Sequence, residues 1–128
     1  MPLSQVLIAD DDPLLRAILE HKLAAAGFSV RSVEDGRAAL AEVETGWPQI
    51  VVLDAMMPIM DGFEALRRLK QDPKSREIPV VMLTALKRDE DVLSALHAGA
   101  SDYLSKPFNP DELVARLTRL AMSARAEG

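Results

Sequence analysis

The sequence predicts an α/β protein whose five parallel strands form a doubly wound sheet in the order 2-1-3-4-5. Short apolar runs alternate five times with helical patterns along the 128 residues. The central runs are rich in β-branched residues and apolar at successive positions, which is typical of strands covered on both faces. Right-handed crossovers between such strands favour this order, with a crevice at the carboxyl ends of the first and third strands.

Three apolar runs predict buried strands, and two weaker runs predict strands at or near an edge of the sheet. The buried runs are Val6–Ala9, Ile50–Leu53 and Val80–Leu83. Phe28–Ser32 alternates between apolar and polar residues, and Asp102–Ser105 is short and partly polar. Both features are typical of strands that have solvent on one side.

Helical patterns fill the gaps between these strands. The expected helices are Pro13–Ala26, Gly36–Thr45, Asp61–Lys70, Arg88–Ala98 and Asn109–Ala124. Asp12 is expected to cap the first helix, with Pro13 at its first position and Gly27 just past its end. Asp61 and Glu64 have the spacing of a capping box at the third helix.

Composition excludes several classes of protein. Cysteine is absent, so disulfides and cysteine-based metal centres are excluded. Neither an apolar run of ~20 residues nor a signal peptide is present, which favours a cytoplasmic protein with no membrane partner. The net charge of −5 argues against direct contact with nucleic acid. One domain is expected over residues 3–124, with 125–128 as a short polar tail or the cut edge of a longer protein.

Chemically complementary groups follow four of the predicted strands. They are Asp10-Asp11-Asp12, Asp54, Thr84-Ala85 and Lys106-Pro107. Because the carboxyl ends of parallel strands share one edge of a sheet, we expect these groups to converge. Singly, each has a simpler interpretation, such as a helix cap for Asp12 or a turn residue for Asp54. The combination favours a functional site.

A cluster of carboxylates at that edge must protonate, move apart or hold a cation. Two like charges ~4 Å apart repel by about 4 kcal/mol at an effective dielectric of ~20. Carboxylate and carbonyl oxygens suit a hard divalent ion such as Mg²⁺. A simple cation site has no use for the Lys106 ammonium or the Thr84 hydroxyl. Their presence predicts a site for a phosphoryl group, with a carboxylate as the attacking group.

Six stretches, in order over nearly the whole chain, resemble one family. They are Val6–Pro13, Val52–Pro58, Met60–Gly62, Val81–Ala85, Ala98–Ala100 and Asp102–Phe108. They resemble the receiver domain of bacterial response regulators, the CheY-like family of two-component signalling, whose fold is flavodoxin-like. The resemblance implies a phosphoacceptor domain and not an enzyme. Its phosphoryl group would come from a phosphohistidine on a sensor histidine kinase or a phosphotransfer protein.

The resemblance also implies a role for each site residue. Asp54 is the implied phosphoacceptor, and Lys106 the residue that pairs with the acyl phosphate. Mg²⁺ would be held by Asp11 and Asp54 directly, by Asp10 through water, and by the backbone carbonyl of Met56.

Further implied roles concern the phosphorylated state. The Thr84 hydroxyl and the Ala85 N–H would bind phosphoryl oxygens, and Thr84 with Tyr103 would form the switch. The Lys106–Pro107 bond is expected to be cis. Phosphorylation would then change the packing of the surface formed by helix 4, strand 5 and helix 5, which would signal to an output domain or partner.

The same surface is a candidate dimer contact. Arg88 with Glu112, and Asp102 with Arg116, resemble positions that pair across two-fold dimers in the transcription-factor branch of the family. Solvated surface charges are the simpler interpretation of these four residues.

Two other classes remain open. Asp10-Asp11-Asp12 contains an Asp-x-Asp, similar to Mg²⁺-dependent phosphatases of the haloacid dehalogenase type, although the chain is short for that family and has no cap domain. A flavodoxin-like electron carrier would need a Ser/Thr/Gly-rich loop after the first strand, where three aspartates would repel the FMN phosphate.

Overall fold

Within residues 4–85 and 89–127, which the computed structural model describes, five strands alternate with five helices. The strands are β1 (Gln5–Ala9), β2 (Ser29–Val33), β3 (Ile50–Asp54), β4 (Val80–Thr84) and β5 (Asp102–Ser105). The helices are α1 (Pro13–Ala25), α2 (Gly36–Glu44), α3 (Gly62–Gln71), α4 (Asp89–His97) and α5 (Pro110–Glu127). The alternation predicted from the sequence is confirmed.

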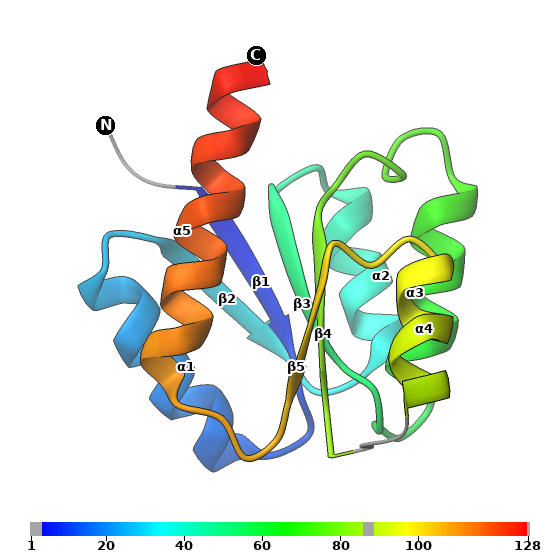
Figure 1. Cartoon of the computed structure of the whole chain (residues 1–128), viewed down its shortest axis with the longest axis horizontal. Helices are drawn as coiled ribbons and strands as arrows, with labels where there is room; N and C mark the ends of the chain where they lie inside the picture. The colour runs from blue at the N-terminus through cyan, green and yellow to red at the C-terminus, as the bar shows by residue number, and fades with distance from the viewer. Residues whose placement is uncertain (1–3, 86–88, 128) are drawn as a thin grey trace.

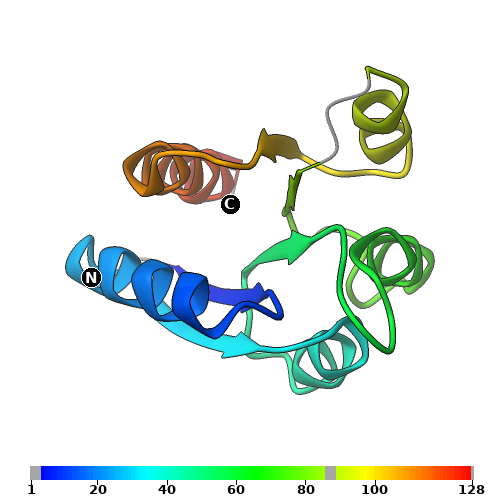
Figure 2. The ribbon, with the colours of Figure 1, turned by 90° about the horizontal axis from the view of Figure 1, so that it is seen from below.

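The strands form one parallel sheet in the predicted order, β2-β1-β3-β4-β5. Helices α1 and α5 cover one face, and α2, α3 and α4 cover the other (Figure 1, Figure 2). β1 and β3 are adjacent at the centre, and the chain leaves them toward opposite faces. The fold is therefore the doubly wound, flavodoxin-like arrangement, whose crevice lies where these two strands end.

Successive residues of the central strands point to opposite faces, so each strand contributes to two apolar cores. On the α1 and α5 side, Ile8 and Val52 pack with Leu19 and Leu117. On the other side the core contains the alternate strand residues, with side chains from α2, α3 and α4. Burial on both faces explains why β1, β3 and β4 appear in the sequence as continuous apolar runs.

Most element boundaries differ from the sequence prediction by one residue, and the end of α5 differs by three. β2 runs from Ser29 to Val33, one residue later than predicted, and Phe28 just before it is buried in the core. α5 continues to Glu127, so residues 125–127, assigned to a polar tail, are helical. Ala, Arg and Glu are good helix formers, and no glycine or proline interrupts them before Gly128.

Aspartate caps fix where three helices begin after the strand ends. The Asp12 carboxylate accepts hydrogen bonds from the N–H groups of Leu14 and Leu15, at 3.0 and 3.3 Å. Asp35 and Asp61 cap α2 and α3 in the same way. These caps satisfy N–H groups that have no partner within the helix. Among the described helices, none combines the length and apolar character needed to span a bilayer.

Candidate functional site

Three carboxylates meet at the carboxyl ends of β1 and β3. One oxygen each from Asp10, Asp11 and Asp54 lies within 4.8 Å of the other two. Asp10 is fully buried and Asp54 is 4% exposed, whereas Asp11 is exposed. The cluster therefore has a buried floor and one side open to solvent, as a site that admits an ion or a ligand requires.

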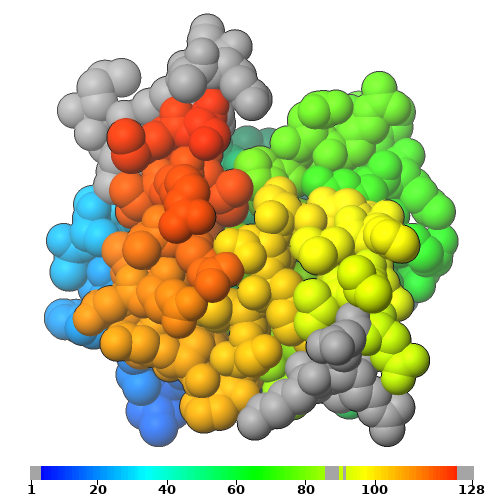
Figure 3. Space-filling model, in the orientation of Figure 1, coloured from blue at the N-terminus to red at the C-terminus, as the bar shows by residue number. Residues whose placement is uncertain are grey.

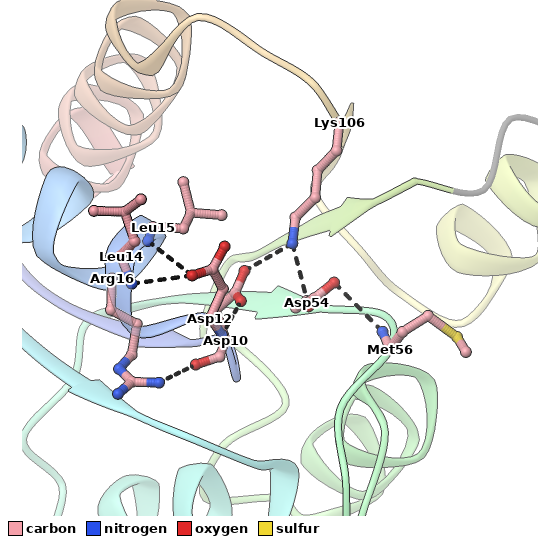
Figure 4. A network of polar contacts seen from close by, with 8 residues as sticks. All are labelled: Asp10, Asp12, Leu14, Leu15, Arg16, Asp54, Met56 and Lys106. Atoms are coloured by element: carbon pink, nitrogen blue, oxygen red, sulfur yellow. Dashed lines mark hydrogen bonds and ion pairs between the residues drawn. The ribbon is translucent and has the colours of Figure 1, made fainter.

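The Lys106 ammonium bridges the two buried carboxylates (Figure 4). Its Nζ lies 2.9 Å from Asp10 Oδ2 and 3.2 Å from Asp54 Oδ2. Lys106 directly follows the edge strand β5, and its backbone N–H donates to the Thr84 carbonyl at 2.7 Å. The Lys106–Pro107 peptide bond is cis, as the resemblance implied. Strand pairing thus anchors the base of a side chain that reaches past β4 to the centre of the sheet.

The surroundings of Asp54 and Lys106 shift the pKa values of both groups. Burial, followed by the negative charge of Asp10, raises the pKa of Asp54, although Lys106 opposes this. Burial alone would lower the pKa of Lys106, but its hydrogen bonds and ion pairs with Asp10 and Asp54 outweigh burial and raise it. Lys106 therefore stays charged, while Asp54 is a carboxylate whose negative charge is not fully compensated.

Local hydrogen bonds orient the two buried carboxylates. Asp10 Oδ1 accepts from the Asp12 N–H at 2.9 Å, while Oδ2 faces Lys106. Asp54 Oδ1 faces the Met56 N–H at 3.4 Å. The Met56 side chain is 63% exposed and points away from the cluster, so this residue can contribute to the site only through its backbone (Figure 4).

The predicted phosphoryl-binding residues lie beside Asp54. The sheet register pairs Asp54 with Leu83, and the buried Thr84 is the next residue along β4. Ala85 follows it and is exposed. Tyr103 lies on β5 opposite Met82, half-buried against the core on the α2, α3 and α4 side. Every predicted site residue is thus located at one end of the sheet or on the strands leading to it.

The donor set fits a hard divalent cation. Three carboxylates surround the site, and within residues 4–85 and 89–127 one ammonium forms ion pairs with two of them, so these four groups carry a net charge of −2 when all three acids are ionised. Oxygen-only ligands with an open side are what Mg²⁺ prefers, since it keeps several of its waters. The residues that could hold such an ion are Asp10, Asp11 and Asp54.

An apolar groove of about 390 Å³ lies beside the ammonium. Its lining is contributed by the first turns of α1 and the segment after β5: Asp12, Leu14, Leu15, Ile18, Ala85, Lys106, Pro107 and Phe108. Leu14 is 69% exposed and Ile18 is 40% exposed. Apolar side chains left open to solvent next to a charged cluster are typical of a contact surface.

Sequence reasoning missed two residues that shape the site. Gly62 is packed so closely that a Cβ there would lie 2.2 Å from the Asp54 carbonyl oxygen. The guanidinium of Arg16 donates to the Asp10 carbonyl at 2.7 Å. Gly62 belongs to the stretch Met60–Gly62 that resembles the family, so that resemblance could have indicated it, but an arginine on a helix carries no sequence signal of this contact.

Comparisons with known proteins agree on one family. The family model described as "Response regulator receiver domain" matches residues 6–118. Response regulator PleD of Caulobacter vibrioides is 44% identical over 117 residues, which cover 91% of this chain and 26% of PleD. The DNA-binding dual master transcriptional regulator RpaA of Synechocystis is 39% identical over 116 residues, covering 91% of this chain and 48% of RpaA.

Solved structures give the same result. The receiver domain of the Francisella response regulator 1452 superposes with a TM-score of 0.89 at 34% identity, covering 94% of this chain and 98% of that domain. Among the curated relatives, the chain spans only about a quarter of PleD and about half of RpaA. The similarity therefore concerns one domain of those longer proteins.

Proposed function

The chain belongs to the response regulator receiver domain family, and on that premise we propose that Asp54 accepts a phosphoryl group from a phosphohistidine. One observation carries the proposal: the Lys106 ammonium bridges Asp10 and Asp54 at the carboxyl ends of adjacent strands, with Asp11 beside them. The donor would be a sensor histidine kinase or a histidine phosphotransfer protein. The domain acts as a phosphoacceptor in the cytoplasm and not as an enzyme with an external substrate.

In the proposed reaction an Asp54 carboxylate oxygen attacks the phosphorus while the phosphorus–nitrogen bond to the donor histidine breaks. Mg²⁺, held by Asp11, Asp54, the Met56 carbonyl and, through water, Asp10, would supply charge neutralisation at the phosphoryl oxygens. Lys106 would exchange its contact with Asp54 for one with a phosphoryl oxygen. Since Asp54 is already fixed in place, most of the catalysis would come from positioning and charge neutralisation.

The phosphorylated state is proposed to act through the α4–β5–α5 surface, which faces the viewer in Figure 3. The Thr84 hydroxyl and the Ala85 N–H would bind the new phosphoryl oxygens. Because Thr84 ends β4 and Tyr103 lies on the neighbouring strand, a movement of one side chain can be transmitted to the other. The result would be a shift between two packings of this surface.

The groove beside Lys106 supports a macromolecular donor. Leu14 and Ile18 leave an apolar strip of α1 exposed next to the ammonium. Such a strip can bury the apolar face of a partner helix, with the partner's phosphohistidine brought over Asp54. The net charge of −5 argues against direct contact of this domain with nucleic acid.

A homodimer through the α4–β5–α5 surface is the second part of the partner proposal. Arg116 donates to Asp102 at 2.6 Å and to Glu112 at 2.9 Å within one chain. Within one chain β5 and α5 already bring Asp102 and Arg116 together, so the proposed pair between chains would require these two side chains to exchange partners. Arg88 lies outside the described residues. Sedimentation with and without a phosphoryl mimic would show whether the chain dimerises, and a chain that stays monomeric at high concentration with the mimic would contradict this part of the proposal.

The direct test is phosphorylation with a small acyl phosphate in the presence of Mg²⁺, followed by mass spectrometry of peptides. We expect one phosphoryl group on Asp54, and none in the Asp54→Asn variant. A label on Asp10 instead would support the phosphatase alternative. A yellow purified protein would support the flavin carrier.

The metal has its own test. An ion that binds only the folded state stabilises it, by about 2.7 kcal/mol at a hundredfold excess over Kd. We expect Mg²⁺ to raise the free energy of unfolding of the wild-type protein, and the Asp11→Asn variant to lose most of that gain. Absence of any Mg²⁺ effect on wild-type unfolding would contradict the proposed ligand set.

A further inference from the structure

Arg16 is attached to the carboxylate cluster through a backbone group. It lies in the second turn of α1, and its side chain is only 17% exposed. Nη1 donates to the backbone carbonyl of Asp10 at 2.7 Å (Figure 4), and Nη2 lies 3.9 Å from Glu34 Oε1. The guanidinium therefore links the end of β1 to the segment that follows β2.

The carbonyl that Arg16 binds lies where β1 leaves the sheet. The β1–β2 register ends with Ala9 opposite Val33, and the Asp10 N–H still donates to the Val33 carbonyl at 3.1 Å. The Asp10 carbonyl belongs to the next peptide, beyond the paired residues of β2. A buried carbonyl needs a donor, and the guanidinium provides it.

This contact bears on Asp11, the exposed acid of the cluster. The Asp10 carbonyl and the Asp11 N–H share one planar peptide unit, so fixing one fixes the direction of the other. On the far side of Asp11, the Asp12 N–H is held by Asp10 Oδ1 at 2.9 Å. Asp11 is thus placed between two anchored backbone groups, although its own side chain is open to solvent.

We propose that Arg16 is a positioning residue for the cation site, which holds the Asp10–Asp11 peptide so that the Asp11 carboxylate faces Asp10 and Asp54. The proposal rests on the proposed function, because that function supplies the cation. Groups that orient metal ligands from behind typically change metal affinity by about 10- to 100-fold when they are removed.

The proposal can be tested because removal of Arg16 would change Mg²⁺ affinity in opposite directions, depending on whether its charge or its positioning contact matters more. A positive charge near a cation site repels the cation, so its removal by itself strengthens binding. Loss of a positioning contact leaves Asp11 free to turn away, which weakens binding. The direction of the change in Mg²⁺ affinity therefore separates the two effects.

The experiment is a Mg²⁺ titration of the whole chain. Calorimetry measures the affinity directly, and thermal unfolding measures the stabilisation that Mg²⁺ gives. It compares the wild-type protein with Arg16→Met, which keeps a long side chain but has no donor, and with Arg16→Lys, which keeps a donor and the charge. Arg76→Met is the matched control, since Arg76 precedes β4 at the other end of the sheet and pairs with Glu77 at 3.9 Å. Far-ultraviolet circular dichroism without Mg²⁺ checks that each variant is folded.

We expect Arg16→Met to weaken Mg²⁺ binding about tenfold, with Arg16→Lys in between and Arg76→Met unchanged. Unchanged or tighter binding by a folded Arg16→Met protein would overturn the role of Arg16 and leave the proposed function intact. A wild-type protein without any Mg²⁺ response would overturn both. If Arg16→Met does not fold, Arg16→Lys decides. Weaker Mg²⁺ binding by that variant supports the positioning role, because the charge is kept and only the geometry of the donor changes, whereas wild-type or tighter binding contradicts the proposal.

Discussion

The loops after β1 and β3 both adjoin the acid cluster, since Asp10 and Asp11 lie in the first loop and Asp54 is the residue just before the second, but the two loops are held in different ways. After β1 the chain turns into α1 within three residues, and polar side chains hold it: Asp10 binds the Asp12 N–H, and Asp12 caps the helix. After β3 seven residues precede α3, and although Asp61 caps that helix too, hydrogen bonds between backbone groups also hold this longer loop. The Gly62 N–H donates to the Ala55 carbonyl at 3.0 Å, and the Met60 N–H donates to the Pro58 carbonyl at 2.7 Å.

This difference implies that the two loops are sensitive to different changes. The loop after β1 depends on charge and hydrogen-bonding capacity, so substitutions that keep volume but remove a polar atom should disturb it most. The loop after β3 depends on close backbone approach, so added volume should disturb it most. The two parts of the cluster can therefore be perturbed separately. Removal of a polar atom should disturb Asp10 and Asp11, whereas added volume in the loop after β3 should disturb Asp54.

The largest effect is expected from Gly62→Ala. An added Cβ would lie 2.2 Å from the Asp54 carbonyl oxygen and 2.8 Å from its carbonyl carbon. Both are backbone atoms of a central strand and cannot move aside easily. We expect a loss of about 3 kcal/mol in the free energy of unfolding, at the upper end of overpacking costs, measured by urea denaturation.

Gly46→Ala is the matched control for that variant. Gly46 has a φ of +77°, but a Cβ there meets nothing within 4 Å. Only the backbone penalty applies, about 1 kcal/mol. Equal losses in the two variants would show that the close approach at Gly62 does not hold the loop after β3.

The second prediction concerns how the free energy of unfolding depends on pH through Asp54, the residue just before the loop after β3. Burial and Asp10 raise the pKa of Asp54 above its ordinary value of 3.8, so the folded protein holds this proton more tightly than the unfolded chain does. As pH rises through the interval between the two pKa values, the folded state loses stability, with a limiting slope of about 1.4 kcal/mol per pH unit for one proton.

The measurement is urea denaturation of wild-type protein and the Asp54→Asn variant without Mg²⁺, from about pH 4 to about pH 8. We expect the free energy of unfolding of the wild type minus that of the variant to fall with rising pH and then to level off. A difference that grows with pH would mean that the Lys106 pair outweighs burial, and that Asp54 is not the uncompensated acid of the cluster.

The contacts that hold the two loops also show which features a sequence can predict and which it cannot. The strand order, the three aspartates after β1 and the convergence of Asp54 with Lys106 follow from apolar runs and strand ends, which sequence patterns record directly. The Arg16 contact with a carbonyl and the fit of Gly62 against Asp54 depend on distances between backbone segments, which no residue pattern records. The contact of Asp102 with Arg116 within one chain likewise depends on how β5 and α5 lie relative to each other.

The third prediction addresses the loop after β1. Asp12→Ala removes the oxygen that accepts from the Leu14 and Leu15 N–H groups, and loss of such a cap costs about 1 kcal/mol. Asp12→Asn is the control, since asparagine caps equally well but has no charge. We expect urea denaturation to show the loss in the alanine variant only. A similar loss in the asparagine variant would mean that the charge of Asp12, and not its cap, stabilises the loop.

The smallest effect is expected from Ile59→Gly in the loop after β3. Ile59 has a φ of +69°, a left-handed conformation that is unusual for a β-branched residue, and the Met60 N–H closes a three-residue turn around it. Its side chain is 77% exposed, so removing it gives up little packing. Glycine relieves a strain of about 1–2 kcal/mol but adds freedom to the unfolded chain that offsets about half of it.

We therefore expect Ile59→Gly to raise the free energy of unfolding by about 0.5 kcal/mol, measured by urea denaturation. Ile59→Ala is the control, because it removes the side chain but keeps a Cβ in the same strained backbone, and it should give no gain. A stabilised alanine variant would mean that the exposed isoleucine side chain, and not the backbone conformation, destabilises the wild-type protein. A stabilised glycine variant alone would show that the loop after β3 keeps its shape through backbone geometry even where the local residue opposes it.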